Sequence, residues 1–168
     1  MQPAQRLRSA ARADAPLHLI LVEPQIAPNT GNVARLCAAT GCALHLVEPL
    51  GFSIADRELK RAGLDYWASL EVTVHASLDA FLTAWTTPLW LFSTHAKRPY
   101  RAAAYAPGDA LMFGKETAGL PATLVAAYGD RALRIPMRPD AVRSLNLSTS
   151  VGIATYAALA ALDFPGLV

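Results

Sequence analysis

Three segments of the chain carry polar residues in patterns that suit ligand binding. The first, EPQIAPNTGNVAR (residues 23–35), contains two prolines, two candidate helix caps, Asn29 and Thr30, and an arginine, Arg35. A helix N-terminus beside an arginine is suited to an anion such as a phosphate. The alternative is ordinary helix capping, with Arg35 as a solvated or paired charge.

The second segment, MFGKETAGLP (residues 112–121), is shaped by its glycines. Gly114 directly follows a predicted strand and Gly119 comes five residues later, so the backbone allows close approach by another group. Glu116 is the only acid in the segment. The spacing fits neither a Walker loop nor the dinucleotide fingerprint, and a tight turn made for packing is the alternative.

The third segment, IPMRPDAVRSLNLSTSVG (residues 135–152), is rich in hydroxyl and amide side chains. They stand before or at the start of an otherwise apolar helix: Ser144, Asn146, Ser148, Thr149 and Ser150. Helix capping accounts for one or two such residues, but not for five. The surplus indicates a polar ligand or an unusual path of the chain.

The histidines are weaker candidates. His18 and His45 fall inside predicted strands, where core or edge positions are expected, and His75 and His95 fall near strand ends. No nucleophile has a fixed relation to any of them. The chain also lacks the GxSxG elbow of a serine hydrolase.

Six apolar runs alternate with helical patterns and position these segments. Strands are predicted over 17–22, 43–48, 71–76, 88–93, 110–114 and 131–136, and helices over 29–41, 77–85, 121–129 and 147–162, with a charged helical patch over 54–63. This alternation, with strands too apolar for a wet face, predicts an α/β domain with a mostly parallel sheet and helices on both faces. Ligands bind such sheets beyond the carboxyl ends of the strands.

Length and composition narrow the class of protein. A chain of 168 residues, 53% hydrophobic and 17% charged, has room for one domain and is too apolar to be disordered. The net charge of +2 comes from the basic segment 1–16, predicted to be a weakly ordered tail, and 17–168 form the domain. An RNA-contacting arm is the alternative for this tail.

The sequence favours neither a membrane protein nor a metal-binding protein. The uncharged stretch 144–162 has a polar first half, and its fully apolar part is shorter than the roughly 20 residues of a spanning helix. The N-terminus lacks the apolar segment of a secretory signal. Cys37 and Cys42 have no Cys or His partners at metal-binding spacing. A reduced, cytoplasmic protein without a metal is therefore predicted.

The last predicted helix, 147–162, carries no charge and is rich in alanine. A helix that is apolar nearly all round is buried on more than one face, which predicts a homodimer interface. A purely internal helix is the alternative.

Taken in order, EPQIAPNTGNVARLCAATG, MFGKETAGLP and IPMRPDAVRSLNLSTSVGIATYAAL resemble the three motifs of the SPOUT class of RNA methyltransferases. RAGLDYW (residues 61–67) and the ending FPGLV are similar to the small subfamily that methylates the ribose 2′-oxygen of the tRNA wobble nucleotide, cytidine or a modified uridine. The resemblance covers 17–168. It implies a C-terminal deep trefoil knot, a homodimer, the cofactor S-adenosylmethionine and the anticodon stem-loop of tRNA as partner.

The resemblance also assigns roles to matching positions. Arg35 matches an arginine that acts from the partner subunit. Because an arginine keeps its proton, we expect it to orient the hydroxyl or a phosphate rather than serve as a base. Residues that orient substrate would be Asn29, Ser148 and Tyr156, and those that hold the cofactor would be Thr94, Gly114, Gly119, Ile135, Ser144 and Leu145. Ribosomal RNA as substrate, and a non-catalytic RNA-binding protein of the same fold, are the alternatives.

Overall fold

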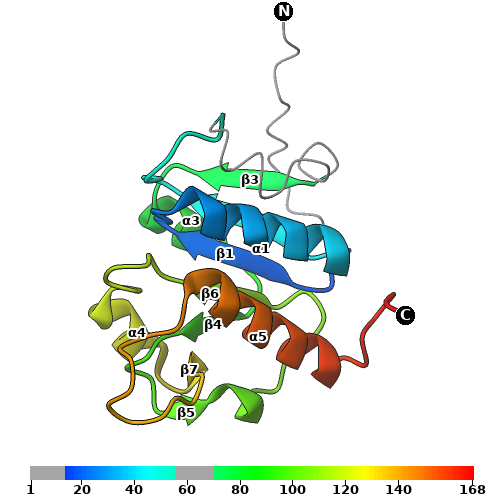
Figure 1. Ribbon diagram of the computed structural model, residues 1–168. Helices are drawn as coiled ribbons and strands as arrows, with labels where there is room; N and C mark the ends of the chain where they lie inside the picture. Colours follow the sequence, from blue (N-terminus) through cyan, green and yellow to red (C-terminus); the bar gives the residue numbers. More distant parts are fainter. Residues whose placement is uncertain (1–13, 56–69) are drawn as a thin grey trace, which may run out of the picture.

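A parallel sheet is the centre of the fold. The computed structural model describes residues 14–55 and 70–168 (Figure 1). Its strands are β1 His18–Val22, β2 Ala43–Val47, β3 Val72–His75, β4 Leu89–Phe92, β5 Arg98–Pro99, β6 Ala110–Phe113 and β7 Ala132–Arg134. In the described ranges they form one seven-stranded sheet in the order β3-β2-β1-β6-β4-β7-β5, with every neighbouring pair parallel.

Helices cover both faces of this sheet. They are α1 Ala27–Thr40, α3 Leu78–Ala84, α4 Ala122–Tyr128 and α5 Leu147–Ala161, with 3-10 turns at Tyr100–Ala102 and Gly129–Arg131. Because side chains alternate along a strand, Leu19 and Leu21 of β1 face α1 and α5, which lie side by side (Figure 1). Ile20 and Val22 face α3 and α4. The predicted α/β class, with a mostly parallel sheet covered on both faces, is confirmed.

The predicted N-terminus of the first helix is wrong. α1 begins at Ala27, with Ile26 as its N-cap and no side-chain cap, so neither Asn29 nor Thr30 caps it. Pro28 explains the earlier start, since a proline in the first helical turn has no N–H to leave unpaired. Asn29 therefore lies inside the helix, where its amide is available for other partners.

β5 was not among the predicted strands. It has only two residues, Arg98 and Pro99, and pairs with β7 at the edge of the sheet. A proline is tolerated on an edge strand, but it also removes the pattern by which a strand is recognised. The motif at 61–67, the tail up to residue 13 and the charged patch from residue 56 onward lie outside the described residues.

α5 begins at Leu147, as predicted. Asn146 caps it, because its Oδ1 accepts a hydrogen bond from the backbone N–H of Thr149 at 3.2 Å. One face of the helix is buried in the core, while Tyr156 on the outer face is 47% exposed. No helix in the described part of the chain is long and apolar enough to cross a membrane.

Both cysteines are free and buried. Cys37 packs among the hydrophobic residues of α1 and α5, and burial raises the pKa of its thiol. Cys37 is therefore a small core residue, since a buried thiol with a raised pKa is a poor nucleophile.

Three histidines lie side by side across the first three strands. His18 Nδ1 is 3.0 Å from His45 Nε2, and His45 Nδ1 is 3.0 Å from His75 Nε2. The rings of Phe81 and Trp85 from α3 and its C-terminus pack against them. A neutral imidazole has one donor and one acceptor nitrogen, so three neutral rings satisfy each other in a single direction along the row. This explains how histidines occupy the core positions predicted for His18 and His45.

We expect the free energy of unfolding to fall as the pH is lowered from about 7.5 to about 5. Burial, followed by the neighbouring His18 and His75, lowers the pKa of His45 from 6.5 to about 3. The unfolded chain therefore binds the proton first, and acid costs the folded state about 1.4 kcal/mol per pH unit once the pH is below the unfolded pKa. The stability is fully present above pH 6.5 and is lost as the pH falls toward 3.

Urea denaturation at the two pH values measures this effect. A His45→Leu variant is expected to depend less steeply on pH than the unaltered chain, whereas His95→Gln, at an exposed position, should keep the full dependence. Equal slopes for the unaltered chain and His45→Leu contradict the assignment.

Candidate functional site

A cavity of about 630 Å³ opens at the carboxyl ends of β4, β6 and β7. This volume lies within the range of small-molecule sites. The segments that follow these three strands form most of its wall, and the start of α1 completes it. Parallel strands bring their carboxyl ends to one edge of a sheet, which is why segments far apart in sequence meet here.

Aromatic rings at two strand ends are part of the cavity lining. Phe92 of β4 and Phe113 of β6 stack with their centroids 4.8 Å apart and their planes 17° apart. Ile135, Met137 and Leu145 add further apolar wall. The lining of the cavity therefore combines apolar side chains with backbone and polar groups.

The segment after β6 closes upon itself. Gly119 N donates to Lys115 O at 2.8 Å, and Gly119 adopts a φ of 68°. A Cβ on Gly114 would lie 2.0 Å from the carbonyl carbon of Gly119 and 2.1 Å from Leu120 N. Gly114 is therefore required for the close approach of the segment's own backbone, and the resulting turn forms one wall of the cavity.

Glu116 fixes this turn to the start of α1. Its Oε2 accepts from the backbone N–H of Gln25 at 2.8 Å, and its Oε1 accepts from Ile26 N and from Asn29 Nδ2, both at 3.1 Å. A carboxylate is favoured at this end of a helix by the helix dipole. The anion at this terminus is thus the protein's own carboxylate, where the sequence had indicated a phosphate.

The same hydrogen-bonded chain reaches the third segment. Asn29 Oδ1 accepts from Asn146 Nδ2 at 3.0 Å, and Asn146 Oδ1 accepts from Ser148 Oγ at 2.7 Å. Each of these donors meets an acceptor, which fixes the orientation of both amides. Glu116, Asn29 and Asn146 therefore link the three sequence segments around the cavity.

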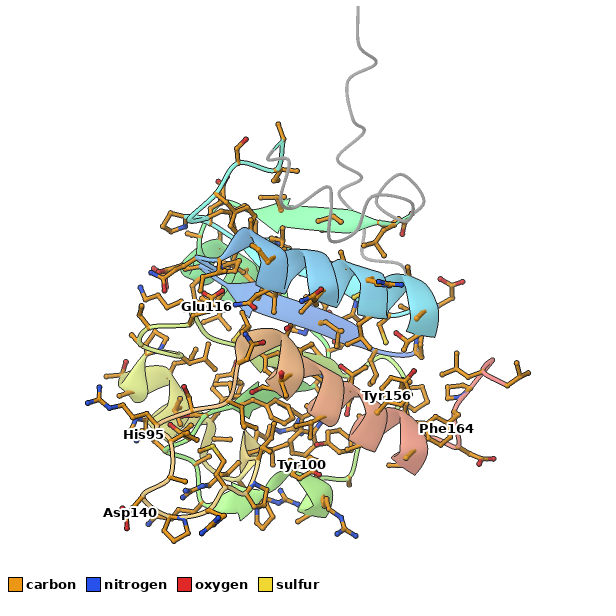
Figure 2. All side chains as sticks on the ribbon, viewed as in Figure 1. His95, Tyr100, Glu116, Asp140, Tyr156 and Phe164 are labelled. Carbon is orange, nitrogen blue, oxygen red and sulfur yellow. The ribbon has the colours of Figure 1, made fainter. Side chains whose placement is uncertain are left out.

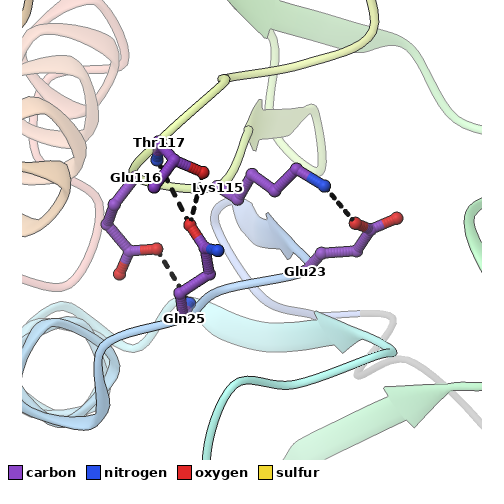
Figure 3. Close-up of polar contacts among 5 residues, drawn as sticks. All are labelled: Glu23, Gln25, Lys115, Glu116 and Thr117. Carbon is purple, nitrogen blue, oxygen red and sulfur yellow. Dashed lines mark hydrogen bonds and ion pairs between the residues drawn. The ribbon is translucent and has the colours of Figure 1, made fainter.

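A second set of contacts joins the segments after β1 and β6 (Figure 3). Lys115 Nζ lies 2.8 Å from Glu23 Oε2, and Gln25 Oε1 accepts from Thr117 Oγ1 at 2.8 Å. Both members of the ion pair are about one-third exposed, so it contributes about 1 kcal/mol or less. These contacts help to position the two segments, but Glu116 provides most of the connection between them.

We expect Glu116→Gln to weaken binding in the cavity by about 10-fold, since leaving the amide donor of the buried Asn29 unpaired costs about 1–3 kcal/mol. The amide has one acceptor oxygen, whereas three donors now share two carboxylate oxygens. Calorimetry with S-adenosylmethionine, the cofactor that the resemblance of the three motifs implies, measures the effect. Thr117→Val, which removes one exposed contact to the same segment, is the control and should change the affinity less than about 3-fold; equal affinities for both variants contradict the role of Glu116.

The structure brings together most of the residues that the sequence singled out. Those that line the cavity are Asn29, Thr94, Gly114, Gly119, Ile135, Ser144 and Leu145. Ser148 is outside the lining, but bonds Asn146, which is part of it. Tyr156 lies toward the C-terminal end of α5, beside Phe164. It is far from Glu116, which lies near the start of α1 (Figure 2).

Arg35 is exposed on α1 and does not line the cavity of its own chain. Its predicted role in a site shared with a second subunit stays a prediction. Glu116 was noted in the sequence as a lone acid, but received no role. The available signal was that Glu116 is the one acid in a segment bounded by two glycines. Its carboxylate is the side chain of that segment best suited to accept hydrogen bonds from backbone N–H groups of another loop.

Comparison with known proteins decides the family. The model of the SpoU rRNA Methylase family matches residues 16–156. The chain belongs to this family. The resemblance drawn from the three motifs is thereby confirmed, since the matched range includes the first two motifs and nearly all of the third.

Individual members of the family are similar over nearly their whole length. The tRNA (cytidine(34)-2'-O)-methyltransferase of Escherichia coli is 48% identical over 155 residues, which cover 90% of this chain and 98% of that protein. The protein of the same name from Saccharophagus degradans is 45% identical over 151 residues, which cover 89% of this chain and 97% of that protein.

Solved structures of other proteins share the fold. A structure described as giving insights into the 2-OH methylation of C/U34 on tRNA is 45% identical, with a TM-score of 0.83 over 88% of this chain and 96% of that one. An AdoMet-bound rRNA methyltransferase from Sinorhizobium meliloti has a TM-score of 0.81 at 24% identity, over 93% of this chain and 60% of that one. At that identity the second likeness concerns the fold alone.

Proposed function

We propose that this chain transfers a methyl group from S-adenosylmethionine to the ribose 2′-oxygen of the wobble nucleotide of tRNA. The observation that carries the proposal is that all six residues matched to cofactor binding meet in one cavity. Relatives that match from end to end at 45–48% identity are named for this reaction.

The cavity fits the chemical character of this cofactor. Its apolar rings, Phe92 and Phe113, suit an adenine, and backbone groups from Gly114 to Gly119 suit polar contacts at close range. Glu116 is the one acid among the lining residues. When bound, the cofactor supplies an activated methyl group on a positively charged sulfur.

The protein's part in the reaction is to position the ribose. The hydroxyl oxygen must approach the methyl group in line and lose its proton, and holding that geometry accounts for much of the rate. Asn29, fixed by Glu116 and Asn146, lies in the cavity wall and would help to orient the substrate. Arg35 would orient the hydroxyl or its neighbouring phosphate as a permanent cation.

A homodimer completes the proposed site. The outer face of α5 exposes Tyr156, whose ring centroid is 6.3 Å from that of the exposed Phe164. Exposed aromatic groups on an uncharged helix favour a second copy of the chain as the covering partner. In such a dimer Arg35 and Tyr156 would serve the cavity of the other subunit, which accounts for their distance from their own.

The C-terminal trefoil knot and the division into a tail (1–16) and one domain (17–168) belong to the same proposal. The path of the chain after β7 supports the knot. β7 lies near one edge of the sheet, yet α5, which follows it, packs beside α1. Asn146, the cap of α5, also donates a hydrogen bond to Asn29 of α1. Such a path places the third segment against the first, as the cavity requires.

tRNA is favoured over ribosomal RNA as the substrate. The relatives named for tRNA are matched over 97–98% of their length, whereas the rRNA enzyme from Sinorhizobium meliloti is longer and less similar. Mapping 2′-O-methyl groups in the RNA of a deletion strain separates the two substrates. Loss of a ribosomal methyl group with an intact wobble position would overturn the choice.

Calorimetry with S-adenosylmethionine separates an enzyme from a non-catalytic RNA-binding protein of the same fold. We expect saturable binding at one site per chain. The absence of binding would favour the non-catalytic alternative.

A further inference from the structure

The edge of the sheet at β5 and β7 carries basic side chains that the proposed reaction does not use. Arg98 is half-buried, and the exposed residues around it are Lys97, Arg101, Arg131 and Arg134. The only acid in residues 97–101 and 130–134 is Asp130. We call these five basic residues the arginine edge.

Two guanidinium groups of this edge are held over one indole ring. The Cζ of Arg131 is 5.0 Å from the centroid of the Trp90 ring, and that of Arg98 is 5.7 Å from it. Arg98 also donates to the backbone oxygens of Asp130, at 2.9 Å, and Ala102. Arg98 is therefore held by two hydrogen bonds and the ring, and the exposed Arg131 lies against the same ring.

The counter-charge that would balance this pair is missing from the described part of the chain. There, no carboxylate forms an ion pair with any member of the arginine edge. Asp109 is buried at the other edge of the indole, where it accepts from Trp90 Nε1 at 2.7 Å and from Ala106 N at 2.9 Å. Contact with the indole ring contributes to holding the two cations but supplies no negative charge.

A phosphate group matches this arrangement. Guanidinium groups bind phosphate oxygens through paired N–H donors, and groups already held in place lose little conformational entropy on binding. A nucleic-acid backbone presents phosphates in series, and the flanking Lys97, Arg101 and Arg134 provide further exposed contacts. An isolated acidic side chain would use only one of these positions.

We propose that the arginine edge binds the phosphate backbone of the RNA substrate outside the cavity. The inference rests on the proposed function. None of the five residues lines the cavity, yet Arg134 directly precedes Ile135 and Lys97 follows His95 by two positions, and both Ile135 and His95 do line it. Arg134 and Lys97 thus place the arginine edge next to two segments that line the cavity.

The test compares RNA affinity in Arg101→Gln/Arg131→Gln with that of the unaltered chain, using a full-length unmodified tRNA transcript. Fluorescence anisotropy over roughly 50–200 mM salt gives Kd and its salt dependence. We expect roughly 3- to 10-fold weaker binding in the variant, and a slope of log Kd against log salt that is smaller by about 1 for each phosphate that the variant no longer binds. Cofactor affinity should be unchanged.

The matched control is Ala76→Glu/Ala80→Glu. It changes the net charge by the same amount at exposed positions beside β3, the opposite edge of the sheet. Unchanged affinity in the control supports the inference. An equal decrease in affinity in the control, or none in the double arginine variant, overturns it.

Two further measurements distinguish failure of this inference from misfolding of the variant and from failure of the proposed function. Arg101 forms no side-chain hydrogen bond or ion pair within the described residues, so Arg101→Gln alone should keep the melting temperature and reduce the salt slope; an unchanged slope in this variant overturns the inference. Failure of the proposed function appears differently, as no methyl transfer by the unaltered chain at any RNA concentration.

Discussion

Arg35→Ala is expected to lower the rate of methyl transfer by about 100-fold or more, while leaving the affinity for S-adenosylmethionine unchanged. Arg35 is exposed on α1 and absent from the wall of its own cavity, so its removal should disturb neither the cofactor nor the core. The decrease should appear in kcat at saturating RNA, because a group that orients the reacting hydroxyl acts in the transition state. Single-turnover transfer to tRNA and calorimetry measure the two quantities.

Arg35→Lys is the matched variant for this residue. It keeps the positive charge and removes the planar fork of donors, so partial recovery would indicate a charge effect and no recovery would indicate bidentate orientation. Sedimentation of each variant reports the oligomeric state. A dimer that dissociates together with the disappearance of activity would make Arg35 a structural residue and contradict the role given to it.

Gly114→Ala is expected to destabilise the chain by about 3 kcal/mol and to prevent cofactor binding. The added methyl carbon would meet backbone atoms of Gly119 and Leu120 at 2.0–2.1 Å, and backbone cannot rotate away as a side chain can. The turn from Lys115 to Gly119 must open to relieve the clash, which displaces Glu116 from its three donors.

Urea denaturation and calorimetry measure the two effects of Gly114→Ala. Ala118→Ser adds one heavy atom at an exposed position of the same turn and should change the free energy of unfolding by about 0.5 kcal/mol or less. Equal stability of Gly114→Ala and the unaltered chain would show that the turn is not closed as described.

The sheet was predictable because its pattern is local. Runs such as LHLILV and ALHLVE are too apolar for a wet face, and a proline follows each of them within two residues. The two-residue strand Arg98–Pro99 was not, because its pairing with β7 is a tertiary contact that leaves no trace in hydrophobic periodicity. The start of α1 depended in the same way on Pro28, a residue whose effect is on backbone geometry rather than pattern.

The site was predictable in its members but not in its connections. Gly114 and Ser144 were singled out for their backbone and polar character, and both line the cavity. Glu116 accepts hydrogen bonds from Gln25 and Asn29, which are 91 and 87 positions away. These contacts follow only from the parallel pairing of β1 with β6. The row of three histidines was likewise hidden, since each one alone is compatible with a core position.

The central claim is that the methyl group goes to the ribose of the wobble nucleotide. The most direct test incubates the chain with labelled S-adenosylmethionine and two transcripts of one tRNA, one of them with 2′-deoxyribose at the wobble position only. We predict one methyl group per normal transcript, recovered as the 2′-O-methyl nucleoside after digestion, and none on the deoxy transcript. Equal labelling of both transcripts, or labelling of neither, would contradict the claim.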